Sequence, residues 1–223
     1  MTPDPGQPAA FFDLDLTLLS VNSASVWLKR MWREGEIGPL ALARSIGWLV
    51  QYKLAILDLE EITSKGLKDL EGVLEADMRL KVEAWYEAEI RDLFYPEALE
   101  LVEHHRRQGH RLFLATGSSP YISHMVAQQL DLEGYVCTLL EVREGRFTGH
   151  ALSPVCYGPG KLQRAEDLAL REGIDLSQSW FYTDSYTDLP LLRRVGYPVA
   201  ANPDPRLRRL ALKEGIPIKD FSF

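Results

Sequence analysis

The stretch Ala-Ala-Phe-Phe-Asp-Leu-Asp-Leu-Thr, residues 9–17, decides the fold of this chain. Four apolar residues lead directly into two carboxylates, Asp13 and Asp15, and then a hydroxyl, which is typical of a short buried strand that ends in a polar loop. Two acids at one strand end can be held in different environments and take different chemical roles. The alternative is structural, because Asp-x-Asp after a strand also occurs in Asx-turns and helix caps.

The composition is that of an ordinary globular protein. The 223 residues are enough for one moderately large domain or a core with an insert, and 46% are hydrophobic and 26% charged. The net charge of -7 argues against nucleic acid as the main partner. The basic run at residues 206–213 is interpreted as a solvated helix face, because Asp204 and Glu214 lie beside it.

The sequence favours a reducing cytoplasm. Cys137 and Cys156 follow neither the Cys-x-x-Cys nor the Cys/His spacing of a zinc site or redox pair. Residues 1–8 lack the basic and apolar regions of a signal peptide. The most apolar segment, residues 46–59, is interrupted by polar side chains and falls short of the roughly 20 residues that a membrane span needs. We therefore expect a cytoplasmic protein with no membrane partner.

After Thr17 the pattern turns helical for most of the next eighty positions. Apolar residues recur at helix-compatible spacings from Trp27 to Tyr86, with glycines as breaks, and few residues before Tyr95 have strand character. The sequence therefore predicts an all-helical insert of three to five helices. It divides the chain into a core domain of residues 1–19 and 94–223 and a helical domain of residues 20–93.

Short apolar strands and helices alternate in the rest of the chain. The helices tend to begin at proline or aspartate and end at glycine, and the expected strands are residues 9–12, 111–116, 180–183, 198–201 and 216–218. Residues 135–142 and 146–152 predict a β-hairpin that turns at Gly145. Strands separated by helices of about a dozen residues imply a parallel sheet with helices on both faces, a Rossmann-like α/β fold.

Ligands of such sheets bind beyond the carboxyl ends of the strands, where Asp13, Thr116 and Asp184 are expected to meet. Thr116, Gly117 and Ser118 supply a hydroxyl, a glycine that allows close backbone approach, and N–H groups at a helix start. This combination suits a phosphate dianion. The structural alternative is an N-capped helix that follows a strand.

Charged residues at the same edge indicate that the site binds an anion and a cation. Lys161 opens a helix, where the macrodipole disfavours a positive charge, so a compensating anion is expected unless the lysine points into solvent. Asp184 and Asp188 join Asp13 and Asp15 as four acids, which would repel one another unless a hard cation neutralised them. Oxygen ligands without histidine or cysteine nearby favour Mg²⁺ over zinc. Asp188 also has an alternative role as a helix N-cap.

The order of these stretches resembles the haloacid dehalogenase (HAD) superfamily, in the branch that contains phosphoserine phosphatase. The helical insert is similar to that branch's cap domain, so the resemblance implies a HAD-like core with an inserted all-helical cap. The match covers nearly the whole chain, and its four motifs are Asp13-Leu-Asp15-Leu-Thr17, Thr116-Gly117, Lys161 and Asp184-Ser-Tyr-Thr-Asp188.

The resemblance implies a Mg²⁺-dependent phosphomonoesterase that works through an aspartyl-phosphate. Asp13 would attack phosphorus, and Asp15 would protonate the leaving alcohol and then activate water. Asp188 would support Lys161 or a metal-bound water. The phosphoryl oxygens would be bound by Thr116, Gly117, Ser118 and Lys161, and Mg²⁺ by the Asp13 carboxylate, the Asp15 carbonyl and Asp184.

Three positions depart from the phosphoserine phosphatase pattern. Those enzymes carry a glutamate five residues beyond the first-motif threonine, where it binds the substrate ammonium; here that position is Asn22. Thr116 and Thr183 stand where Ser and Gly are usual. Asn22 is therefore predicted to contact the leaving group and to tilt specificity away from phosphoserine, which makes histidinol-phosphatases equally good models.

We expect a small phosphorylated metabolite as substrate, no nucleic-acid partner, and a monomer or homodimer. A phosphotransferase with the same aspartyl-phosphate chemistry is an alternative, as is a catalytically idle protein that binds a phosphometabolite. Dehalogenase chemistry is disfavoured, because that branch usually lacks an acid at the position of Asp15.

Overall fold

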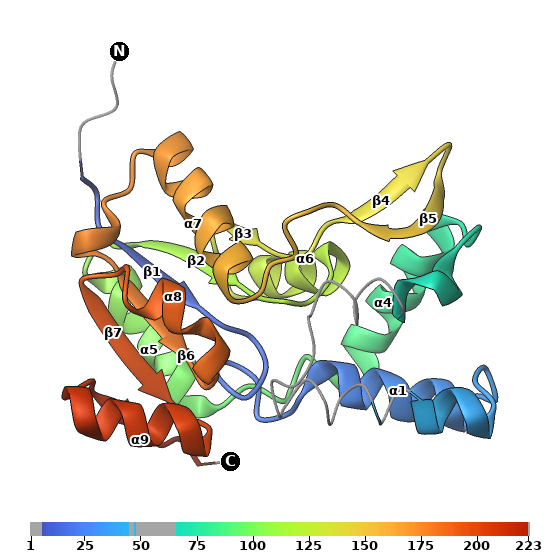
Figure 1. Cartoon of the computed structure of the whole chain (residues 1–223), viewed down its shortest axis with the longest axis horizontal. Helices are drawn as coiled ribbons and strands as arrows, with labels where there is room; N and C mark the ends of the chain where they lie inside the picture. Colours follow the sequence, from blue (N-terminus) through green and yellow to red (C-terminus); the bar gives the residue numbers. More distant parts are fainter. Residues whose placement is uncertain (1–5, 45–46, 48–65, 223) are drawn as a thin grey trace.

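A computed structural model describes residues 6–44, 47 and 66–222 (Figure 1). Its centre is a parallel sheet, as the sequence predicts, with six strands in the order β3-β2-β1-β6-β7-β8. The strands are β1 Ala9–Phe12, β2 Arg111–Ala115, β3 Gly134–Val136, β6 Trp180–Thr183, β7 Tyr197–Ala201 and β8 Ile218–Lys219.

Strand β1 reads as an unbroken apolar run because it lies in the middle of the sheet and is covered on both faces. Its side chains alternate between faces: Ala10 and Phe12 enter one hydrophobic cluster, and Ala9 and Phe11 enter the other. None of the four is accessible to solvent. The central position places Asp13, the next residue, between two neighbouring strand ends.

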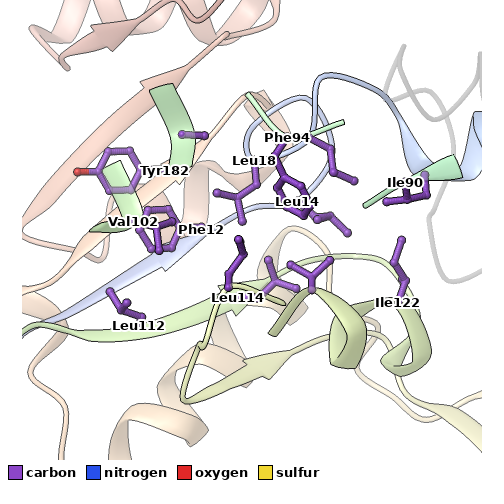
Figure 2. Close-up of a cluster of buried hydrophobic side chains, with 14 of the residues drawn as sticks. Phe12, Leu14, Leu18, Ile90, Phe94, Val102, Leu112, Leu114, Ile122 and Tyr182 are labelled. Carbon is purple, nitrogen blue, oxygen red and sulfur yellow. The ribbon is translucent and has the colours of Figure 1, made fainter. Parts of the chain in front are cut away.

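Helices cover both faces of the sheet. On one face, Phe12 and Leu114 pack with Val102 and Ile122 in the cluster that Figure 2 shows. These two helical residues come from α5 (Pro96–Arg107) and α6 (Pro120–Gln129). The opposite face is covered by α7 (Pro159–Glu172), α8 (Leu189–Leu192) and α9 (Pro205–Glu214).

The predicted β-hairpin is partly wrong. The run at residues 135–142 splits into β3, which joins the main sheet beside β2, and β4 (Leu140–Arg143), which pairs antiparallel with β5 (Arg146–Ala151). The chain turns between them because Thr138 is buried and its N–H donates to the Ser118 carbonyl (3.1 Å), outside either ladder. The last strand also begins two residues later than expected, at Ile218.

In the described part of residues 20–93, the named elements are helical: α1 (Ser23–Arg33), the 3₁₀ turn Lys68–Leu70 and α4 (Glu75–Glu89). Trp85 and Tyr86 of α4 belong to the same hydrophobic cluster as Leu14 and Leu18. Apart from Gly47, the apolar segment 46–59 and the expected helical position Ile62 lie outside the described residues. The division into two domains stays a prediction.

Within the described part of the chain, no helix combines the length and the hydropathy that a membrane crossing requires.

Candidate active site

Three neighbouring strands deliver side chains to one edge of the sheet. Asp13 follows β1, Thr116 follows β2 and Asp184 follows β6, and β1 pairs with both of the other strands. These residues line one cleft of about 760 Å³ together with Asp15 and Lys161. The structure therefore brings the four sequence motifs together at the carboxyl edge of the sheet, where α/β folds bind ligands.

Lys161 is buried between two carboxylates and does not point into solvent. Its Nζ donates to Oδ1 of Asp13 (3.1 Å) and to Oδ2 of Asp188 (2.6 Å). Lys161 is 2% exposed to solvent, Asp13 is 7% exposed and Asp188 is 1% exposed. Thr183 Oγ1 donates to the same Oδ2 of Asp188 (2.7 Å). Although Asp188 occupies the N-cap position of α8, its side chain makes no capping hydrogen bond, so it serves the lysine.

The loop before α7 explains how a lysine reaches this position. A Cβ on Gly160 would lie 2.1 Å from the carbonyl oxygen of Val155, so only glycine allows the helix to begin so close to that loop. Burial lowers the pKa of Lys161, but the charges of Asp13 and Asp188 outweigh it and raise the pKa above its ordinary value. The amine therefore stays charged near neutral pH.

Asp15 is held by the start of α1. The Ser23 N–H donates to its Oδ1 (2.9 Å) and the Asn22 Nδ2 donates to its Oδ2 (3.1 Å). Asn22 also caps the helix, because its Oδ1 accepts from the N–H of Ser25 (3.0 Å). Burial raises the pKa of Asp15, and the hydrogen bonds from Ser23 oppose that rise. The Asn22 oxygen and one Nδ2 hydrogen are thus engaged, and the contact of this side chain with a leaving group stays a prediction.

The predicted phosphate loop lines the same cleft as the buried lysine. Thr116 is buried, and its Oγ1 accepts from the N–H of Ser118 (3.1 Å), which leaves the hydroxyl proton available for donation. A Cβ on Gly117 would lie 3.5 Å from the Cys156 carbonyl oxygen, in ordinary contact. Ser119, at the N-cap of α6, makes no side-chain capping bond, so the simple capped-helix alternative loses support.

The edge carries more negative than positive charge. Burial, and then the neighbouring carboxylates, raise the pKa of Asp184. Burial also raises the pKa of Asp13, and Lys161 opposes that rise. Oδ1 of Asp188 is buried without a hydrogen-bond partner. Among the described residues of this cluster, one lysine faces the four acids, so a further cation would be stabilised here.

The donors suit Mg²⁺. The carboxylates of Asp13 and Asp184 and the main-chain carbonyl of Asp15 are hard oxygen ligands, and Mg²⁺ commonly takes one or two carboxylates and keeps several waters. In the portions of the chain that the structure describes, no three acidic, imidazole or thiol side chains group as a metal site. A cation held by two carboxylates, one carbonyl and water is compatible with that arrangement.

The structure adds two residues that sequence reasoning missed, both in the loop after β7. Asn202 Nδ2 donates to the Leu16 carbonyl (3.1 Å), and Leu16 has a left-handed φ of 57°. The Asp204 N–H donates to the Asp184 carbonyl (2.7 Å), and its Oδ2 accepts from the N–H of Tyr186 (2.7 Å). The loop after β7 therefore binds both the loop that follows Asp13 and the loop that begins at Asp184. The available signal was Asn-Pro-Asp directly after a predicted strand, at the same sheet edge.

Comparisons with known proteins agree with the family resemblance. The sequence model of haloacid dehalogenase-like hydrolases matches residues 10–193. Phosphoserine phosphatase SerB1 of Mycobacterium tuberculosis is 33% identical over 220 residues, which cover 96% of this chain and 70% of that protein. A histidinol-phosphatase of Neisseria meningitidis is 27% identical over 217 residues, with coverages of 95% and 98%.

Among solved structures, a protein of unknown function from Bordetella pertussis matches with a TM-score of 0.86 and 29% identity, over 96% of this chain and 99% of that one. The parallel sheet, its helical layers and the family match together confirm the predicted fold class. The chain is an enzyme of the haloacid dehalogenase-like hydrolase family.

Proposed function

We propose that this enzyme is a Mg²⁺-dependent phosphomonoesterase that hydrolyses a small phosphorylated metabolite through an aspartyl-phosphate. The observation that carries the proposal is the buried contact of Lys161 with Asp13, in a cleft that Thr116 and Asp15 also line. A nucleophilic carboxylate, a cation for the phosphoryl oxygens and a second acid with a raised pKa are the parts that this chemistry needs.

In the first step, a carboxylate oxygen of Asp13 forms a bond to phosphorus while the ester P–O bond breaks. Asp15 gives its proton to the leaving alcohol. Lys161 and the Thr116 hydroxyl donate to the phosphoryl oxygens, which carry the charge that develops in the transition state. The products of this step are the free alcohol, an ionised Asp15 and a phosphorylated Asp13.

In the second step, Asp15 takes a proton from a water molecule that attacks phosphorus. The bond between phosphorus and Asp13 breaks, inorganic phosphate leaves, and Asp13 is again a carboxylate. Burial favours the neutral form of Asp15, while the donors from Ser23 favour the ionised form. This balance supports a group that alternately gives and takes one proton.

The Mg²⁺ would be held by Asp13, Asp184 and the carbonyl of Asp15, and Asp188 would support Lys161. When bound, it supplies positive charge that neutralises the acids and the transferred phosphoryl group. The names of the two relatives, a phosphoserine phosphatase and a histidinol-phosphatase, support a small phosphorylated metabolite as substrate. We also propose a cytoplasmic location and a monomer or homodimer.

Phosphate release is the assay that tests this function. The purified protein should release inorganic phosphate from at least one small phosphate monoester in the presence of Mg²⁺, and excess chelator should stop the release. Release of the alcohol without inorganic phosphate would instead indicate transfer to another acceptor. Binding of phosphate esters without any turnover would indicate an idle binding protein.

Asp184→Asn is expected to raise the Mg²⁺ concentration for half-maximal activity by about tenfold or more, because one of two carboxylate ligands loses its charge. The readout is a Mg²⁺ titration of phosphate release, with Mg²⁺ affinity of the free protein measured by calorimetry. Asp167→Asn, on the exposed face of α7, is the matched control. An unchanged Mg²⁺ requirement would show that Asp184 is not a ligand.

Asn22→Glu is expected to raise the preference for phosphoserine over an uncharged phosphate ester by about ten- to a hundredfold. A carboxylate facing the substrate ammonium makes a charge-assisted hydrogen bond of roughly 1.5 to 3 kcal/mol. Both absolute kcat/KM values should fall, because glutamate cannot donate to Asp15 as Asn22 does. Asn22→Gln is the control, because glutamine has the length of glutamate but keeps the neutral amide. It therefore separates the effect of the charge from that of the longer side chain. An unchanged preference in Asn22→Glu would mean that residues other than Asn22 recognise the leaving group.

A further inference from the structure

The cleft extends well beyond the acids and the lysine, onto the helical insert. Its wall on that side contains Trp27, Leu28 and Met31 of α1, together with Ile37, Leu70 and Met78. All six side chains are half-buried, so they present apolar surface to the cleft. Trp27, Leu28 and Met31 share one face of α1, because their spacings of three and four residues follow the helical repeat.

Charged side chains on this wall are already paired. Of the described residues that line the cleft from the insert, Asp69 and Lys81 are the charged ones. Lys81 forms an ion pair with Glu36, and its Nζ lies 5.6 Å from the centre of the Trp27 ring. Asp69 forms an ion pair with Arg44 at 2.7 Å. A substrate ammonium or carboxylate in this region would therefore compete with existing partners.

Two polar side chains near Asp15 already have partners within the protein. The Asn22 amide binds Asp15 and the start of α1, and Asp204 caps α9 through the N–H groups of Arg206 and Leu207. A polar leaving group would lose hydration against the apolar wall without gaining equivalent bonds there, which is unfavourable. An apolar group would instead displace water from apolar side chains, which is favourable.

The size of the cleft also favours an apolar leaving group that is larger than serine. At about 760 Å³, it falls within the range of pockets that enclose a drug-sized ligand. A phosphorylated amino acid as small as phosphoserine would leave much of the apolar wall in contact with water. A longer apolar alcohol would cover more of this wall while its phosphate lies beside Lys161.

We propose that the preferred substrates are phosphate monoesters of apolar, uncharged alcohols, with the hydrocarbon part seated on the wall formed by Trp27, Leu28, Met31, Ile37, Leu70 and Met78. This inference rests on the proposed phosphomonoesterase function, and it names the leaving group of that same site. It separates this chain from the substrates in the names of its relatives, because phosphoserine and histidinol phosphate carry an ammonium close to the phosphate.

A series of n-alkyl phosphates from ethyl to hexyl tests the inference, because the leaving-group chemistry stays nearly constant while the buried apolar area grows. With Mg²⁺ present, kcat/KM should rise about three- to fourfold per added methylene until the wall is covered. Hexyl phosphate should exceed phosphoserine and histidinol phosphate in kcat/KM. A flat series, or a preference for phosphoserine, would overturn the inference while the phosphatase function stands.

Met31→Gln, in the wall, should lower kcat/KM for hexyl phosphate by about tenfold and leave ethyl phosphate within about twofold. Trp32→Gln is the matched control, since Trp32 is the next residue of α1 and is exposed outside the cleft lining. An equal response of both esters to Met31→Gln would contradict seating on this wall.

Binding of n-alkyl phosphonates, which are not hydrolysed, gives a readout without turnover. Calorimetry on the full chain with Mg²⁺ should show affinity that increases with chain length, and Met31→Gln should weaken that dependence. If no ester is hydrolysed but phosphonate affinity still increases with length, the proposed phosphatase function fails while the apolar wall is supported. Affinity that is independent of chain length would overturn the wall itself.

Discussion

Asp13→Asn is expected to reduce phosphate release by a factor of about 10³ or more and to leave the fold intact. The amide keeps the shape of the side chain but cannot form the acyl phosphate, and removal of a nucleophile costs orders of magnitude in kcat. The protein should remain folded because Lys161 still has Asp188 at 2.6 Å. Loss of one buried carboxylate also reduces the repulsion that raises the pKa of its neighbour Asp184.

Two measurements separate catalysis from stability in this variant. Phosphate release is compared with that of Asp167→Asn, which changes an exposed acid of α7. Urea unfolding is then followed for both variants and should give a midpoint for Asp13→Asn that is equal to or above that of the parent. Activity that stays above one tenth of the parent would rule out a covalent route through Asp13.

Strands and helix boundaries were predictable because their signals are local. The apolar run at residues 9–12 marks a central strand, and the prolines and glycines that bound the later helices act within a few residues of their own position. The hairpin was the exception. Nothing in the apolar run at 135–142 indicated that its first part would join β2 while the rest paired with β5.

Asp13, Thr116 and Asp184 were predictable as neighbours because parallel strands bring their carboxyl ends to one edge. Lys161 was predictable because the macrodipole disfavours a positive charge at the start of a helix, which indicated a nearby anion. The direction of individual side chains was not. Asn22 follows the first motif closely, yet its amide is directed to Asp15 because it also has to cap α1. The contact of Asn202 with Leu16 joins residues 186 positions apart, which no local pattern encodes.

Lys161→Met is expected to destabilise the protein and to lower kcat/KM by about a hundredfold or more. Methionine fills a similar volume, so the main change is the loss of the amine that donates to Asp13 and Asp188. Removing one member of a buried ion pair leaves uncompensated charge and costs about 3 to 5 kcal/mol. The activity falls because the phosphoryl oxygens lose a cation in the transition state.

The loss of stability in Lys161→Met should increase with pH. Lys161 lowers the pKa of Asp13, so its removal raises that pKa further above the unfolded value. A carboxyl whose pKa is raised on folding favours the folded state at low pH and loses that contribution as the pH rises through the folded pKa. The unfolding free energies of parent and variant should therefore differ more at pH 8 than at pH 5, as urea titrations without Mg²⁺ can measure.

Asp188→Asn provides the matched partner for a double-mutant cycle. Asp188 is 1% exposed, and without Lys161 its remaining side-chain donor is Thr183 at 2.7 Å. Neutralising it removes one of the two carboxylates that lose their cation, so the double variant should recover about 1 to 3 kcal/mol relative to Lys161→Met alone. If Lys161→Met unfolds at the parent's urea concentration at pH 8, the two acids are solvated and the buried ion pair does not stabilise the site.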